Sequence, residues 1–125
     1  MLAARAGHIA VVKALLDAGA AVNSKNKFLC TALHQASLEG HIEVLTMLLD
    51  AGADIAAREE HGCTPLMGVS QGGHLAAVQL LVERGALINT SNDNGETALS
   101  RAIHYKRTDV IKYLISKAAI NFKFK

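Results

Sequence analysis

The strongest constraint on the fold is an internal period of 33 residues. A segment that begins with Gly-His and continues with aliphatic residues starts at Gly7, Gly40 and Gly73. Other residues recur at the same spacing: Thr31, Thr64 and Thr97; Leu33, Leu66 and Leu99; Gly19, Gly52 and Gly85. A fixed period of this length is typical of stacked structural units that resemble one another. The chain is therefore expected to fold as an array of units in place of a single globule.

Each unit is predicted to begin with a short helix. In the third copy, the hydroxyl group of Thr64 can cap the helix N-terminus. Pro65 suits the first helical position because a backbone N–H is not needed there. The helix is expected to end near Gly72 and Gly73. The same segment of the other copies is expected to form the same short first helix.

A second, amphipathic helix is predicted after each Gly-His pair. In the second copy, the apolar residues have the spacing that places them on one helix face: Ile42, Val44, Leu45, Leu48 and Leu49. Gly52 can end this helix in the left-handed conformation at no steric cost. Asn94-Gly95 indicates a tight turn in a linking segment. One unit leaves much of its aliphatic surface exposed, so stability is expected to depend on contacts between neighbouring units.

The repeated segments resemble ankyrin repeats over nearly the whole chain. The resemblance is carried by "TALHQASLEGHIEVLTMLLDAGADI" and "GCTPLMGVSQGGHLAAVQLLVERGALIN", with diverged copies on either side. It implies an all-α solenoid of about four stacked helix–loop–helix units with projecting β-hairpins, the first unit being incomplete. The chain is then a single domain, residues 1–125, with units at approximately 1–25, 26–58, 59–91 and 92–125.

The resemblance also implies structural roles for most of the histidines. His8, His41 and His74 follow the repeated glycine, where the family's imidazole hydrogen-bonds to backbone groups in the loop between the two helices. His34 stands in the family's TPLH position and is expected to hydrogen-bond to Thr31. Because the first three histidines are a whole unit apart, they cannot converge on one metal ion.

No motif in the sequence indicates catalysis. A phosphate-binding loop, a GxSxG motif and an HExxH motif are absent, and the Gly pair of "SQGGH" lacks the preceding strand that a phosphate loop needs. The alternative to a chain without a metal site is a zinc site that includes His61, Cys63 and Cys30. Their spacing matches no standard zinc-binding pattern, and a fourth ligand is missing. We therefore expect a non-enzymatic protein with no metal or other cofactor.

The distribution of charge argues against a nucleic-acid partner, and the two cysteines indicate the cellular compartment. The 13 basic and 11 acidic residues are dispersed, without the basic stripe and interleaved aromatic residues expected of a nucleic-acid-binding protein. Cys30 and Cys63 would be too far apart for a disulfide if units stack about 8–10 Å apart. We therefore expect a reduced intracellular, cytoplasmic chain. No apolar run reaches the roughly 18 residues of a membrane span, and the N-terminus keeps the repeat register, unlike a cleaved leader.

The resemblance implies that hairpin tips and first helices form a concave face that binds a partner protein. The family's variable positions on that face correspond here to Arg5, Ala6, Lys25, Lys27, Phe28, Cys30, Leu38, Glu39, Arg58, Glu60, His61, Cys63, Gln71, Gly72, Ser91, Asp93, Asn94, Glu96, His104 and Tyr105. This set mixes both charge signs with three large apolar residues, which favours a protein or peptide surface over a polyanion. Aromatic residues at the centre of an interface usually contribute most to affinity, so Phe28 is the expected anchor. The alternative is that Phe28 folds back onto its own hairpin or is merely exposed.

Several residues depart from the repeat pattern. Leu29 stands where Gly62 and Gly95 stand in later copies, so the first hairpin is expected either to use another turn geometry or to carry strain of roughly 1–2 kcal/mol. Gly68 falls inside a first helix, where it costs about 0.8–1.0 kcal/mol relative to Ala; that helix is expected to be the softest. Lys106 replaces the repeated glycine in the fourth unit, whose more polar sequence suits a terminal cap.

Both ends of the chain are expected to belong to a longer array. The segment "NFKFK" alternates like the first arm of another hairpin, and Leu2 to Ala6 make up about half of a first helix. A bare first unit would expose Val11 and Leu15. That exposure favours weak self-association of a monomer through the incomplete unit, or a preceding repeat.

The expected function is a protein–protein interaction module that presents a rigid face to a partner of unknown identity. Two alternatives stay open. The array could be the targeting or regulatory segment of a larger enzyme or channel. It could instead be an engineered scaffold, although the irregular Leu29, Gly68 and Lys106 favour a natural sequence.

Overall fold

The computed structural model describes the backbone of residues 2–123 and the side chains of residues 9–118. Within these bounds the chain forms seven helices and no strand: α1 (Leu2–Asp17), α2 (Ala32–Glu39), α3 (Ile42–Asp50), α4 (Pro65–Gln71), α5 (Leu75–Glu83), α6 (Ala98–His104) and α7 (Thr108–Lys123). No described helix has the length and apolar content needed to cross a membrane. The predicted all-α fold is confirmed.

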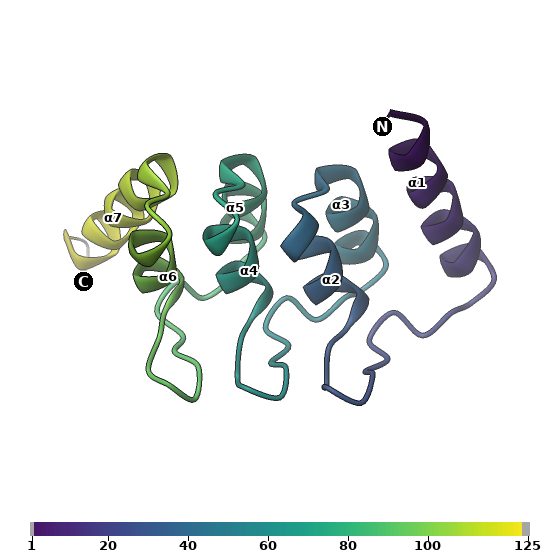
Figure 1. Cartoon of the computed structure of the whole chain (residues 1–125), viewed down its shortest axis with the longest axis horizontal. Coiled ribbons are helices and arrows are strands. Elements are labelled where there is room, and N and C mark those ends of the chain that lie inside the picture. Colours follow the sequence, from purple (N-terminus) through teal and green to yellow (C-terminus); the bar gives the residue numbers. More distant parts are fainter. Residues whose placement is uncertain (1, 124–125) are drawn as a thin grey trace.

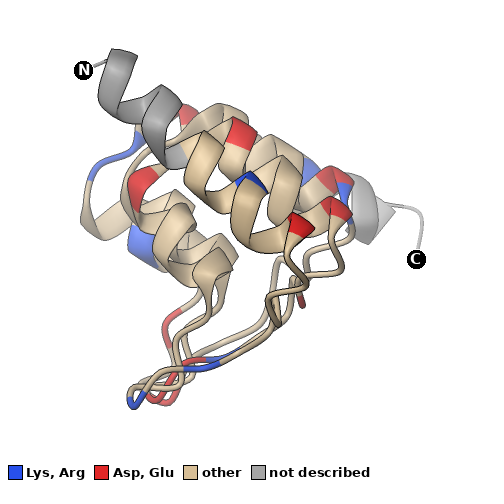
Figure 2. Ribbon diagram, turned by 90° about the vertical axis from the view of Figure 1, so that its right-hand side faces the viewer, with Lys and Arg blue, Asp and Glu red and all other residues tan. Residues whose placement is uncertain are grey.

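The helices form two rows along an elongated stack (Figure 1). Helices α2, α4 and α6 pack against one another in an inner row, and α1, α3, α5 and α7 follow one another in an outer row. Each inner helix also packs on the outer helix that follows it in the sequence. The stack is the solenoid that the repeat predicts. The loops that lead into the inner helices project together to one side (Figure 2).

The hydrophobic core runs through the whole stack and belongs to no single helix pair. Its largest fully buried side chains include one leucine from each of five helices: Leu33, Leu45, Leu66, Leu81 and Leu114. Each such side chain contributes about 1.5–3 kcal/mol by its removal from water. Because neighbouring pairs bury these leucines together, the pairs stabilise one another, as expected for a repeat protein.

The starts of the inner helices follow the prediction at two of three positions. The hydroxyl groups of Thr31 and Thr97 accept hydrogen bonds from the backbone N–H groups of His34 and Ser100, and each partner side chain bonds back to the cap residue. Thr64 makes no side-chain cap bond, so the predicted hydroxyl cap is wrong there. The third residue of that helix is methionine, which cannot complete the reciprocal pair. Helix α4 instead begins with proline at its first turn and ends at Gln71, as predicted.

The projecting loops contain turns, and the predicted β-hairpins are not confirmed. No strand is assigned anywhere in residues 2–123, although each loop reverses direction at a tight tip. Leu29 adopts a φ of 62°, close to the 81° and 76° of Gly62 and Gly95. The first loop therefore uses the same turn geometry as the others, and Leu29 carries the strain of roughly 1–2 kcal/mol that a side chain meets in this region. Lys106 is also left-handed, at 59°, in the place of the repeated glycine.

The first and last helices differ from the prediction. Helix α1 runs without a break through Gly7 and His8, where a loop between two helices was expected. Continued helical hydrogen bonding satisfies the backbone groups of this segment. Helix α7 extends through Ala118 to Lys123, so the extended arm expected from residue 121 onward is wrong for residues 121–123. Alanine stands where the other units have a left-handed glycine, and nothing there ends the helix.

The loop histidines occupy their predicted places but make different contacts. His41 and His74 directly precede α3 and α5 and form their N-caps. Neither imidazole makes the expected hydrogen bond to a backbone group among the described residues; instead His41 Nδ1 lies 3.3 Å from Glu39 Oε2. The ring of His74 lies against Gly40 and Gly72, where added Cβ atoms would come within 2.6 Å of it. The side chain of His8 lies outside the described residues.

Candidate functional site

The tips of the three projecting loops share one internal hydrogen-bond pattern. Asn26 Oδ1 accepts hydrogen bonds from the backbone N–H groups of Phe28 and Cys30, at 2.8 and 3.0 Å. Glu59 and Asn92 begin the second and third tips and accept from the N–H groups two and four residues further on, at 2.7–3.0 Å. A side-chain oxygen at the first position thus holds each tip in shape. We call the three residues that supply it, Asn26, Glu59 and Asn92, the tip locks.

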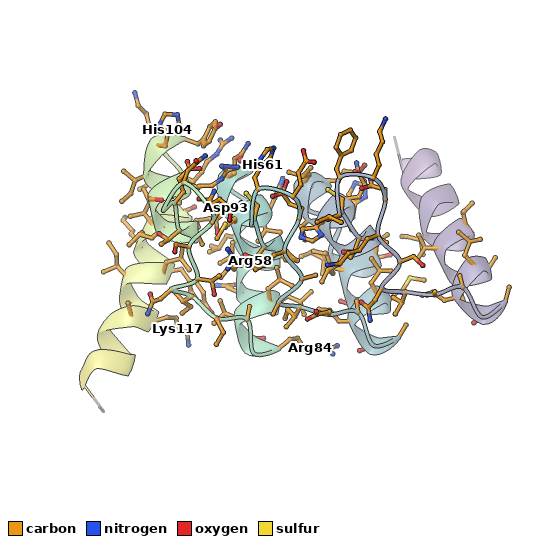
Figure 3. The ribbon with its side chains drawn as sticks, turned by 90° about the horizontal axis from the view of Figure 1, so that it is seen from below. Arg58, His61, Arg84, Asp93, His104 and Lys117 are labelled. Carbon is orange, nitrogen blue, oxygen red and sulfur yellow. The ribbon has the colours of Figure 1, made fainter. Side chains whose placement is uncertain are left out.

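Backbone hydrogen bonds join the three tips into one surface. The N–H of Glu60 donates to the carbonyl of Phe28, and the N–H of Asp93 donates to the carbonyl of His61, both at 2.9 Å. Arg58 adds a cross-unit contact, donating from Nη2 to the carbonyl of Ser91 at 3.1 Å. Figure 3 shows Arg58, His61 and Asp93 together on the loop side of the array. The tips therefore cannot move independently without breaking these bonds.

His34 connects the inner row to the second tip. Its Nδ1 contacts Thr31 at 3.0 Å, which confirms the predicted pair. Its Nε2 lies 2.9 Å from the carbonyl of Ala57 and 3.1 Å from that of Cys63. Because His34 is only 6% exposed, these bonds satisfy a buried polar side chain. The predicted structural role of this histidine extends to the fixing of the neighbouring loop.

A pocket of about 120 Å³ lies where the tips meet the inner helices. The loop side is formed by Cys30, Glu59 and Cys63, and the helix side includes Leu38 and Gly68. A Cβ added at Gly68 would lie 3.5 Å from Ser37 Cβ on α2, an ordinary van der Waals contact. We call the surface formed by the tips (residues 26–30, 59–63 and 92–96) and the exposed sides of α2, α4 and α6 the tip–helix face.

The two thiols of the pocket, those of Cys30 and Cys63, have raised pKa values. Burial, together with the carboxylates of Glu59 and Glu60, raises the pKa of the Cys30 thiol. Burial also raises the pKa of the Cys63 thiol, against the opposing hydrogen bond from Asn92. Both thiols are therefore protonated at neutral pH, and a protonated thiol is a poor nucleophile.

The pKa of Glu59, the acidic lock of the second tip, is shifted in the opposite direction, downward. Burial alone would raise the pKa of Glu59, but the backbone N–H groups of Cys63 and His61 hold the pKa below its usual value. The carboxylate form is the one that accepts both hydrogen bonds. The folded tip thus favours the ionised form of Glu59.

Most of the residues predicted for partner binding lie at the surface. The exposed ones are Lys25, Lys27, Phe28, Leu38, Glu39, Arg58, Glu60, His61, Ser91, Asp93, Asn94, His104 and Tyr105. Those half-buried in or beside the face are Cys30, Cys63, Gln71, Gly72 and Glu96. The predicted side chains of Arg5 and Ala6 lie outside the described residues. Four of the predicted residues, Cys30, Leu38, Cys63 and Gln71, line the pocket.

Phe28, the predicted anchor, is exposed, and its ring contacts one neighbouring side chain. The ring of Phe28 is 47% exposed, and Lys27 Nζ lies 5.0 Å from its centroid, within the range of a cation–π contact. Leu29 beside it is also 47% exposed. Leu38 and Tyr105 are 56% and 43% exposed. Three of these four side chains, Phe28, Leu38 and Tyr105, were predicted for this face.

The residues that shape the face were missed by sequence reasoning. Asn26, Glu59 and Asn92 stand 33 residues apart, so the period itself could have identified them. Arg101, which lines the pocket and contacts Glu96 at 3.5 Å, was also missed. The part of the chain with described side chains holds no cluster of three or more histidine, cysteine or acidic residues arranged to bind a metal ion.

Comparison with known proteins agrees with this architecture. A family model described as ankyrin repeats (3 copies) matches residues 1–59 and again residues 54–124. The two matches together extend over nearly the whole chain, including all three tips and both rows of helices. A search of curated proteins found no match.

Proposed function

Because this chain belongs to the ankyrin-repeat family, we propose that its tip–helix face binds a partner protein or peptide. Ankyrin repeats are generally protein–protein interaction modules. The binding mechanism is rigid presentation: the partner meets a surface already held by hydrogen bonds within and between the tips. Little conformational entropy is then lost on association, which favours affinity for a given set of contacts.

The observation that carries this proposal is the pocket between tips and inner helices. It combines an exposed aliphatic side chain, Leu38, with an ionised carboxylate, Glu59, and a cationic side chain, Arg101. A concave apolar site with a few fixed polar groups is the usual form of a site that receives one side chain of a ligand. Phe28 and Tyr105 lie beyond it on the same face and supply larger apolar anchors.

The charges on the face support a protein surface as the ligand. Basic and acidic side chains alternate at the tips, as in the contact of Arg58 with Asp93 at 3.7 Å (Figure 2). A polyanion would meet acidic residues along its whole length. Such mixed rims usually set specificity and association rate more than affinity, so the apolar anchors are expected to dominate the binding energy.

Affinity capture from native lysate, followed by mass spectrometry, tests this proposal. The intact chain should enrich one or more proteins that a Phe28→Ala/Tyr105→Ala double variant does not. A Leu87→Ala/Ile115→Ala variant, changed at two exposed apolar residues outside the face, is the matched control and should capture the same proteins as the intact chain. Equal capture by the double variant would show that this face is not the binding surface.

We propose three further properties on weaker grounds. The family is typically non-enzymatic, and the protonated thiols support the same assignment for this chain. Both cysteines are free, which supports an intracellular compartment. Val11 and Leu15 are 59% and 55% exposed on α1, which supports a monomer that self-associates weakly through its first unit.

A further inference from the structure

The pocket of the tip–helix face is lined by one guanidinium group and one carboxylate, which come from different units. Arg101 reaches the pocket from α6, and Glu59 reaches it from the second tip. Burial is the main cause of the raised pKa of the Cys63 thiol, while Glu59 raises this pKa further and Arg101 lowers it. Both charges therefore act on the same part of the pocket.

Arg101 has more hydrogen-bond donors than acceptors within reach. Its Nη1 contacts Glu96 Oε1 at 3.5 Å, and that oxygen already accepts a shorter hydrogen bond, of 2.9 Å, from Asn92 Nδ2. Arg101 Nε is buried and donates to no acceptor among the described residues. Buried polar groups without a partner are rare in folded proteins. Because the side chain is still 22% exposed, its terminal nitrogen atoms can donate to a group that enters the pocket.

Glu59 can accept a further hydrogen bond in addition to those that hold the second tip. Its Oε1 accepts from the backbone N–H groups of His61 and Cys63, at 2.7 and 2.9 Å. An ionised carboxylate has about four acceptor sites, so these two bonds leave room for another donor. The pocket thus offers a donor from α6 and an acceptor from the second tip.

Gly68, which lines the same pocket, is not required by the packing of α4. Glycine destabilises a helix interior relative to alanine. An added Cβ would lie 3.5 Å from Ser37 Cβ and 3.7 Å from Leu38 Cδ2, which are ordinary contacts. Alanine would therefore fit and would stabilise α4, but its methyl group would narrow the pocket beside Leu38. Departures from local preference that the fold does not require are expected at functional sites.

The two charges select the chemistry of the side chain that the pocket receives. An anionic side chain would add a third carboxylate beside Glu59 and Glu96, and a cationic side chain would be repelled by Arg101. An aliphatic side chain would cover both charged groups without a hydrogen bond to either. A carboxamide is neutral, and it has an accepting carbonyl oxygen and a donating NH₂ group on separate atoms. It can therefore bond to both charged groups at once.

We propose that this pocket receives the side-chain carboxamide of a glutamine or asparagine of the partner. Its carbonyl oxygen accepts a hydrogen bond from Arg101, its NH₂ group donates to Glu59, and its methylene carbons lie against Leu38. A pocket of about 120 Å³ has room for one such side chain. This inference rests on the proposed function, because it names the residue that the tip–helix face recognises. Arg101 and Glu59 then set specificity, while Phe28 and Tyr105 supply affinity from beyond the pocket.

Selection of random linear peptides from a display library against the intact chain tests this proposal. The recovered peptides should share one position enriched in glutamine or asparagine. In a fluorescent copy of a recovered peptide, replacement of that residue by glutamate, lysine or leucine should weaken binding about tenfold, because hydrogen bonds to charged groups are lost. Selection against Glu59→Gln, which removes the anion, should enrich glutamate at this position, and selection against Arg101→Met should enrich lysine. A library that yields no binder, or binders without such a position, would overturn the proposal.

A variant at Gly68 separates an effect on the pocket from an effect on folding. Gly68→Ala should raise the midpoint of urea denaturation and yet weaken peptide binding about tenfold, because the methyl group narrows the pocket. Thr46→Ala is the matched control, since it also puts a better helix former into a helix interior, on α3 and outside the pocket. It should leave peptide affinity unchanged. Equal affinities of Gly68→Ala and the intact chain would place the recognised side chain elsewhere and overturn the proposal.

The Phe28→Ala/Tyr105→Ala double variant distinguishes failure of this inference from failure of the proposed function. If recovered peptides lose affinity for the double variant but show no preference for a carboxamide, only the assignment of the pocket is wrong. If the peptides bind the double variant as tightly as the intact chain, the anchors of the proposed function are wrong as well.

Discussion

The first and third loop tips have the same backbone shape, but the first presents apolar side chains to solvent and the third does not. Both are held by an asparagine oxygen that accepts from two backbone N–H groups, Asn26 in the first and Asn92 in the third. The first tip exposes Phe28 and Leu29. The equivalent residues of the third tip are Asn94 and Gly95.

The difference shows that the shape of a tip and its surface are set separately. Leu29 takes a φ of 62° although only glycine adopts that region freely. The asparagine lock and the bond from Glu60 N–H to the Phe28 carbonyl impose the turn, and the leucine follows it at a cost. Because a strained, exposed apolar residue improves neither stability nor solubility, its presence beside Phe28 favours a role in partner binding.

Replacement of the asparagine locks should have the largest effect on stability, and the effect should differ between the two tips. Asn92 is 6% exposed and also donates to Glu96 Oε1 at 2.9 Å, whereas Asn26 is exposed. Asn92→Ala leaves half-buried N–H groups without an acceptor and should lower the free energy of unfolding by about 2–4 kcal/mol. Asn26→Ala should lower it by about 1 kcal/mol, since water can replace the exposed oxygen. Urea denaturation measures both; a greater loss for Asn26→Ala would contradict the ranking.

Exchange of the turn residues tests the strain. Gly95→Leu should cost about 1–2 kcal/mol of unfolding free energy, because it puts a side chain into the left-handed region. No atom lies within 4 Å of the added Cβ, so the cost is conformational and not steric. Leu29→Gly should stabilise the chain by roughly 0.5–1 kcal/mol, the relief of strain being partly offset by the greater entropy of unfolded glycine. Both values come from urea denaturation, and a destabilised Leu29→Gly variant would mean that the leucine makes stabilising contacts.

Truncation of the two tip residues tests the difference in surface. With a captured partner in hand, Phe28→Ala should weaken binding by about tenfold, or roughly 1.4 kcal/mol. Asn94→Ala, the equivalent change in the third tip, should alter affinity by less than about threefold. Neither change should shift the thermal transition much, since both side chains are exposed. Calorimetric titration measures the affinities, and unchanged binding by Phe28→Ala would remove it as an anchor.

The same comparison shows which features the sequence predicts. The period of 33 predicted the stacked helices and the alternatives for Leu29, because these depend on residues that recur or fail to recur, whereas the Thr31–His34 pair was predicted from the resemblance to the family. Asn26, Glu59 and Asn92 also have the spacing of 33, but the middle residue is a glutamate, so a comparison by residue identity missed their shared acceptor oxygen.

Features that depend on what lies alongside a segment also escaped prediction. The repeat places a loop at Gly7, but the structure continues α1 through this residue. Residue spacing describes the residues of one unit and not the helices that pack beside it. The pocket of the tip–helix face escaped for a related reason: it is assembled from three units, and Arg101 reaches it from the last of them.

The smallest expected effect concerns the second tip, whose lock is a carboxylate instead of an amide. Because folding lowers the pKa of Glu59, this group contributes stability above its unfolded pKa, near 4.5. The contribution is lost as the pH falls through the lower folded value. Glu59→Gln keeps an acceptor oxygen but removes the titration. The variant should therefore lose less stability than the intact chain between pH 6 and pH 3, by a margin smaller than any change above, because Glu59 is partly solvated and screened. Urea denaturation of both proteins across this range measures the difference in stability, and the titration of all other groups cancels in that difference. Parallel curves of stability against pH would show that the Glu59 lock does not depend on its charge.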